Sequence, residues 1–78
     1  MPVGLLLSGV VIGSDYTTDK DGKKQLVIAI AMGITSERVY MRVQPEVVPP
    51  FGTDVIIKCR AYAGRTGRIV YVDGEIVD

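Results

Sequence analysis

Hydrophobic and polar positions alternate along most of this chain, and glycines or prolines interrupt the alternation at short intervals. This pattern is typical of short β-strands joined by turns. Five strands are predicted, at Val3–Gly13, Lys24–Gly33, Arg38–Val43, Asp54–Tyr62 and Gly67–Val72. Asp73-Gly74 is predicted to end the fifth strand. The proline-rich segment Gln44–Thr53 is predicted to be a crossover with room for one short helical turn at Pro45–Val48, and Val47, Val48 and Phe51 are expected to close the barrel end.

Two predicted strands carry cations and a tyrosine on one face. Successive side chains of a strand point to opposite faces, so one row is Arg38, Tyr40 and Arg42, opposite the apolar row Val39, Met41 and Val43. The fourth strand repeats the arrangement with Lys58, Arg60 and Tyr62. Such rows suit a single-stranded nucleic acid, because cations contact phosphates and rings stack on bases. One row alone is better explained as a solvated strand face with an ordinary tyrosine. The second row makes binding an equally good explanation, and if both rows face one groove they supply four cations and two rings.

A polar, turn-rich segment, Ser14–Lys23, follows the first strand, and its Asp21-Gly22 pair predicts a tight turn. Its length indicates that the flanking strands extend into a projecting hairpin wing. Four side chains are expected to reach a nucleic acid from this wing: Tyr16, Lys20, Lys23 and Lys24. The tip of the last hairpin adds Arg65 and Arg68 to the predicted nucleic-acid-binding residues.

Composition narrows the possible functions of this 78-residue chain. Nine basic and nine acidic residues give no net charge, so any basic surface must be local, with acids such as Asp73, Glu75 and Asp78 expected elsewhere. The chain has no histidine and one cysteine, Cys59, which alternates with core positions and is expected to be buried. We therefore expect no catalytic activity, no metal site, no cofactor and no small-molecule substrate. The apolar start, Met1–Val11, lacks the features of a signal peptide or of a membrane span. We therefore expect a cytoplasmic protein without a membrane partner. If the protein is viral, we expect it in the host cytoplasm.

The predicted layout has five strands, with a wing after the first, a crossover after the third and a hairpin at the end. This layout predicts an all-β fold in which one domain, 1–78, forms a small five-stranded antiparallel OB-like barrel. The layout resembles the gene V single-stranded DNA-binding proteins of filamentous phages. The similarity covers Asp21-Gly22-Lys23 in the wing, Val39-Tyr40-Met41-Arg42-Val43, and the stretch from Phe51-Gly52 through Gly64-Arg65-Thr66-Gly67 to Ile76-Val77. The sequence departs from the family in its acidic wing and in the absence of an aromatic residue between the hairpin glycines.

The resemblance implies a homodimer that coats single-stranded DNA cooperatively, without sequence preference, during phage or mobile-element DNA replication. The dimer interface is expected around the last hairpin, Ala63–Arg68. Two alternatives remain open at the level of sequence. One is a small β-barrel that serves as a structural or oligomerisation module without binding nucleic acid. The other is an RNA-binding OB domain, because stacking and phosphate contacts look alike in sequence.

Overall fold

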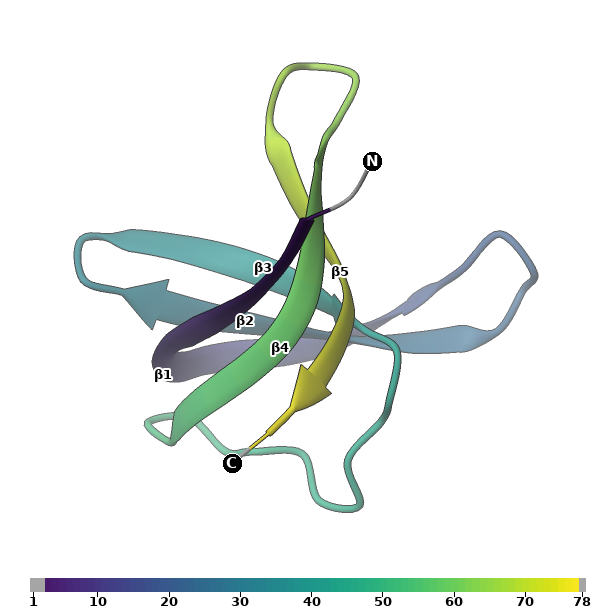
Figure 1. Cartoon of the computed structure of the whole chain (residues 1–78). Helices are drawn as coiled ribbons and strands as arrows, with labels where there is room; N and C mark the ends of the chain where they lie inside the picture. The colour runs from purple at the N-terminus through teal and green to yellow at the C-terminus, as the bar shows by residue number, and fades with distance from the viewer. Residues whose placement is uncertain (1–2, 78) are drawn as a thin grey trace.

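The structure is a computed structural model that describes residues 3–77. It contains five strands: β1 (Val3–Thr18), β2 (Lys24–Met32), β3 (Thr35–Met41), β4 (Asp54–Ala63) and β5 (Ile69–Ile76). They close into a barrel in the order β1-β2-β3-β5-β4, and β4 pairs back onto β1 (Figure 1). Neighbouring strands are antiparallel except β3 and β5, which run parallel. The predicted OB-like barrel is confirmed, with this one parallel pair in an otherwise antiparallel sheet.

The barrel interior is filled by side chains that alternate along each strand with outward-facing residues. The buried cluster consists of Leu7, Val11, Leu26, Ile28, Ile30, Val39, Met41, Val55, Ile57 and Cys59. Cys59 is therefore a core residue, as its spacing predicts. Val43 is not, because β3 ends at Met41 and Val43 is 44% exposed beyond it.

The long first strand belongs to two pairings and bends between them. Its first part pairs with β4 and its second part pairs with β2, with a register shift between Val11 and Gly13. A Cβ atom at Gly9 would lie 2.5 Å from the carbonyl oxygen of Ala31, so only glycine allows β1 to approach β2 this closely. The bend lets one strand line two parts of a closed barrel.

Hairpins project from the barrel in different directions. In Figure 1 the β1–β2 hairpin extends to the right, the β2–β3 hairpin to the left and the β4–β5 hairpin to the top. The first of these is the predicted wing, because β1 and β2 remain paired as far as Thr18 and Lys24. Strand β1 is accordingly longer than the predicted Val3–Gly13, since polar residues continue the ladder into the wing.

The fifth strand does not end at Asp73-Gly74, contrary to the sequence prediction. Asp73 adopts a positive φ of 56°, a conformation that aspartate tolerates better than most residues. The register with both neighbouring strands shifts at this point, so Asp73 is the extra residue of a bulge and β5 continues to Ile76. Gly74 is buried against β3, where its carbonyl accepts the backbone N–H of Arg42 at 2.9 Å.

The segment between β3 and β4 is a loop, and the short helical turn expected at Pro45–Val48 does not form. Val48 packs against the core, which agrees with the expected closure of the barrel end. Val47 and Phe51 do not share this role, because they are 76% and 79% exposed. A search of the described residues found no helix with the length and apolarity needed to cross a membrane.

Candidate nucleic-acid interface

The outer face of β2 and β3 combines small apolar residues with a cation and a tyrosine. Tyr40 lies opposite Val27, and Arg38 lies opposite Ala29, in the antiparallel register. Val27 is only 4% exposed and Tyr40 is half-buried, whereas Arg38 is exposed. The short side chains of β2 therefore leave the arginine and the tyrosine of β3 accessible on this face.

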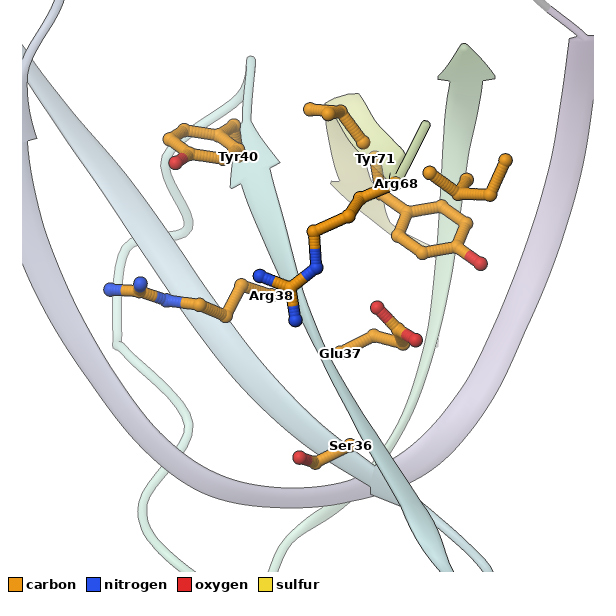
Figure 2. Close-up of a pocket in the computed structure, with 8 residues that line it drawn as sticks. Ser36, Glu37, Arg38, Tyr40, Arg68 and Tyr71 are labelled. Carbon is orange, nitrogen blue, oxygen red and sulfur yellow. The ribbon is translucent and has the colours of Figure 1, made fainter. Parts of the chain in front are cut away.

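An open hollow separates the beginning of β3 from the beginning of β5. The parallel pairing of these strands begins at Val39 and Tyr71, and the segments before these residues diverge. The resulting β3–β5 hollow has a volume of about 650 Å³ and is lined by Ser36, Glu37, Arg38, Tyr40, Arg68, Ile69, Val70 and Tyr71. In Figure 2, Arg38 and Tyr40 lie on one side of β3, and Arg68 extends toward β3 from the start of β5. Two predicted cations and one predicted aromatic residue therefore line one hollow.

A second hollow lies where the end of β3 meets the wing. This β3–wing hollow has a volume of about 290 Å³ and is lined by Asp19, Lys23, Lys24, Gln25, Leu26, Met41, Arg42 and Gln44. Its cations are Lys23, Lys24 and Arg42. The Asp19 carboxylate accepts backbone N–H bonds from Asp21 and Lys23, both at 2.9 Å, which fixes the turn that carries these lysines.

The wing also holds its aromatic residue in a defined place. Lys24 Nζ lies 5.6 Å from the centre of the Tyr16 ring, and Gln44 Nε2 donates a 3.3 Å hydrogen bond to the Tyr16 hydroxyl. Tyr16 remains 45% exposed, so part of its ring is open for stacking. Lys20 and Arg65 are exposed at the tips of the wing and of the β4–β5 hairpin.

The second predicted row, Lys58, Arg60 and Tyr62, does not share a groove with the β3 row. The strand order places β5 between β3 and β4, and the curvature of the barrel turns the outer faces of β3 and β4 away from each other. All three residues are exposed. The expectation of a single groove with four strand cations and two rings is wrong, because alternation defines a face within a strand but not the strand order.

Acidic residues of β5 form exposed ion pairs with one arginine from each row. Arg42 forms an ion pair with Glu75 at 3.8 Å, and Arg60 forms one with Asp73 at 3.4 Å. The expectation that these acids lie away from the rows is therefore wrong, because β5 continues past Asp73. Asp78 lies outside the described residues. Arg38 and Lys58 are the cations of the two rows that form no ion pair among residues 3–77.

The acidic, cysteine and tyrosine side chains of residues 3–77 determine what further chemistry the candidate interface can support. Within residues 3–77, no group of three or more acidic or cysteine side chains is placed to hold a metal ion. Burial raises the pKa of the Cys59 thiol, which keeps it protonated and unreactive near neutral pH. Burial also raises the pKa of Tyr71, and the negative charges of Glu37 and Cys59 add to that shift.

Three residues with a bearing on binding were missed in the sequence. Asp73 and Glu75 could have been recognised from the apolar alternation that resumes at Ile76, which indicates that the strand continues. Glu37 lines the β3–β5 hollow because β3 and β5 diverge there. This divergence cannot be predicted from the local sequence pattern. The importance of Glu37 depends on what occupies that hollow.

No family model, curated protein or solved structure matches this chain. Its function is therefore inferred from the placement of its own side chains on the barrel.

Proposed function

We propose that this protein binds single-stranded DNA without strong sequence preference and coats single strands during phage or mobile-element DNA replication. The observation that carries the proposal is the pair of hollows beside β3, one against the β4–β5 hairpin and one against the wing. In OB folds, oligonucleotides bind on the face of strands 2 and 3, between the loops that correspond to these two hairpins.

The hollows supply the two kinds of contact that a single strand needs. Positive charge for successive phosphates is provided in the β3–β5 hollow by Arg38 and Arg68. In the β3–wing hollow it is provided by Lys23, Lys24 and Arg42. Tyr40 lies beside the first hollow and Tyr16 stands on the wing, so each end of the path has a ring for stacking. Both contacts are tolerant of sequence, because every base has a flat face and every nucleotide a phosphate.

A titration of the purified protein separates this proposal from its alternatives. Labelled oligo-dT, an RNA of equal length and a duplex of equal length are compared at low salt and then with added salt. The proposal requires the oligo-dT to bind best and to dissociate progressively as salt increases. Tighter binding of the RNA would favour an RNA-binding OB domain, and no binding at low salt would favour an oligomerisation module.

We also propose that the protein is a homodimer joined through the β4–β5 hairpin. A domain of this size buries a smaller share of its surface than a larger domain does. The base of the hairpin exposes Tyr62 at 46%, on a strand that projects from the barrel and outside both hollows beside β3. Light scattering at micromolar protein should give about twice the 8.4 kDa of one chain, and a mass of 8.4 kDa would contradict the dimer.

A further inference from the structure

A carboxylate lies in the β3–β5 hollow among the cations that favour phosphate. Glu37 precedes Arg38 on β3, and in the register with β2 it lies opposite the fully buried Ile30. It is half-buried, and it takes part in none of the ion pairs or side-chain hydrogen bonds found among residues 3–77. Figure 2 shows it on the same side of β3 as Tyr71, with the Arg68 side chain nearby. The lining of the hollow thus contains a carboxylate to which no side chain or backbone N–H of residues 3–77 donates a side-chain hydrogen bond.

The groups around this carboxylate are flat or cationic. The negative charge of Glu37 contributes to the raised pKa of Tyr71, after burial, which is consistent with the proximity of the two side chains in Figure 2. The Tyr71 ring and the Arg68 guanidinium are planar groups of the kind on which unpaired bases stack. The volume of about 650 Å³ is within the range of pockets that hold small ligands.

A phosphate is a poor occupant beside Glu37, because two negative groups at close range repel each other. A base edge with N–H donors is a good occupant of the position beside Glu37. The Watson–Crick edge of guanine presents two adjacent donors, N1–H and the 2-amino group, which match the two oxygens of one carboxylate. Cytosine and adenine present one amino group beside an acceptor nitrogen, and thymine presents one N–H between two carbonyls. Guanine therefore satisfies Glu37 best.

We propose that the β3–β5 hollow is a base subsite that prefers guanine, with Glu37 accepting hydrogen bonds from its Watson–Crick edge and Arg38 and Arg68 holding the neighbouring phosphates. This rests on the proposed single-strand binding and adds to it a preference at one nucleotide. The binding along the rest of the path remains tolerant of sequence. A bidentate contact of this kind corresponds to about a tenfold preference for the matching base.

The test uses the unaltered protein and oligo-dT carrying one central substitution. A single guanine should tighten binding about tenfold over all-thymine DNA. Inosine, which lacks the 2-amino group and keeps N1–H, should lose a large part of that gain, and cytosine should gain less than guanine. Equal binding of the guanine, inosine and thymine oligonucleotides would overturn the guanine subsite and leave the proposed function intact. No binding of any of them would overturn both.

Substitution of the carboxylate gives a second, independent measurement. Glu37→Gln keeps the shape of the side chain and removes its charge, so the preference for guanine should fall to within about twofold while oligo-dT binds at least as well as before. Glu46→Gln, in the β3–β4 loop, makes the same charge change and should keep the preference. If Glu37→Gln tightens the binding of every oligonucleotide by the same factor and retains the preference for guanine, Glu37 acts only as a repulsive charge and the proposed guanine subsite is wrong. If the variant does not fold, the inosine comparison on the unaltered protein decides.

Discussion

The Arg60 guanidinium donates a 3.4 Å hydrogen bond to the carboxylate of Asp73, across the pairing of β4 with β5. Asp73 can reach Arg60 because it is the extra residue of the β5 bulge. Glu75, two residues later, pairs with Arg42 at 3.8 Å. One short acidic stretch therefore competes with phosphate for two of the predicted DNA-binding arginines.

Removing these acids should strengthen DNA binding. Asp73→Asn keeps a residue that tolerates positive φ, and Glu75→Gln keeps the shape of the side chain, so both variants should fold. Glu75→Gln should bind oligo-dT more tightly than the parent, with a steeper dependence of log K on log salt, because Arg42 in the β3–wing hollow is released for a phosphate. Asp73→Asn releases Arg60, which lies outside both hollows, and should raise affinity less. The comparison is made by titration at several salt concentrations.

The matched control for this experiment is Glu46→Gln, which changes the charge equally in the β3–β4 loop. It should raise affinity less than Glu75→Gln. If Glu46→Gln has the same effect as Asp73→Asn and Glu75→Gln, the gain reflects net charge alone and the local competition is absent.

Two basic residues from different strands should differ in their effect on binding. Arg38 lines the β3–β5 hollow, whereas Lys58 lies on β4, opposite Glu75 in the register and outside both hollows. Arg38→Ala should lower the salt slope by about 0.7, the value for one lost phosphate contact on a single strand. Lys58→Ala removes the same charge and should leave the slope unchanged. Equal losses in the two variants would show that DNA is not confined to the path beside β3.

The Tyr40 ring should contribute by stacking. Stacking is worth roughly 1–3 kcal/mol per base, so Tyr40→Ala should weaken oligo-dT binding about tenfold or more, while Tyr40→Phe should bind nearly as well as the parent. Tyr40 lies opposite the nearly buried Val27, so its loss should also lower the melting temperature. Affinity is therefore expressed per folded molecule; an unchanged affinity with a lower melting temperature would make Tyr40 a structural residue only.

The strands were predictable from the sequence because alternation and turn residues are local properties. Arg38 and Tyr40 could be assigned to one face of a strand for the same reason. The strands next to that face could not be predicted. Strand β3 pairs with β5 rather than with β4, and the alternation along a strand does not show which other strand it pairs with. Asp73 and Gly74 misled the prediction because they are typical of a turn and here form a bulge inside a strand.

The bulge should be intolerant of a larger residue at Gly74. A Cβ atom there would lie 2.7 Å from Met41 Sδ and 2.8 Å from Val39 Cγ1, both of which belong to buried core residues. Gly74→Ala should lower the free energy of unfolding by about 1–3 kcal/mol, because β5 must move away from β3. Gly4→Ala, where an added Cβ meets no atom within 4 Å, should change stability by less than about 0.5 kcal/mol. Urea denaturation measures both, and equal effects would contradict the close packing at Gly74.

Stability should decrease at alkaline pH because of one buried group, Cys59, and one partly buried group, Tyr71. Burial raises the pKa of Cys59 from its ordinary value of 9.0, and burial, Glu37 and Cys59 together raise the pKa of Tyr71 from 10.0. The unfolded chain loses these protons at lower pH than the folded protein does. The stabilisation is therefore fully present below about pH 8 and decreases as pH rises past 9 toward the raised values in the folded protein.

The contribution of Cys59 can be isolated by comparing the parent with Cys59→Ala in urea denaturation from pH 7 to pH 10.5. The variant should be less stable at pH 7 by roughly 1 kcal/mol, because it leaves a small cavity in the core. Its free energy of unfolding should then fall less steeply than that of the parent above pH 9, since the thiol no longer ionises in the unfolded chain. Tyr71 continues to titrate in both proteins, so some decrease should remain in the variant. If the two curves stay parallel throughout this range, ionisation of Cys59 does not contribute to the alkaline loss of stability.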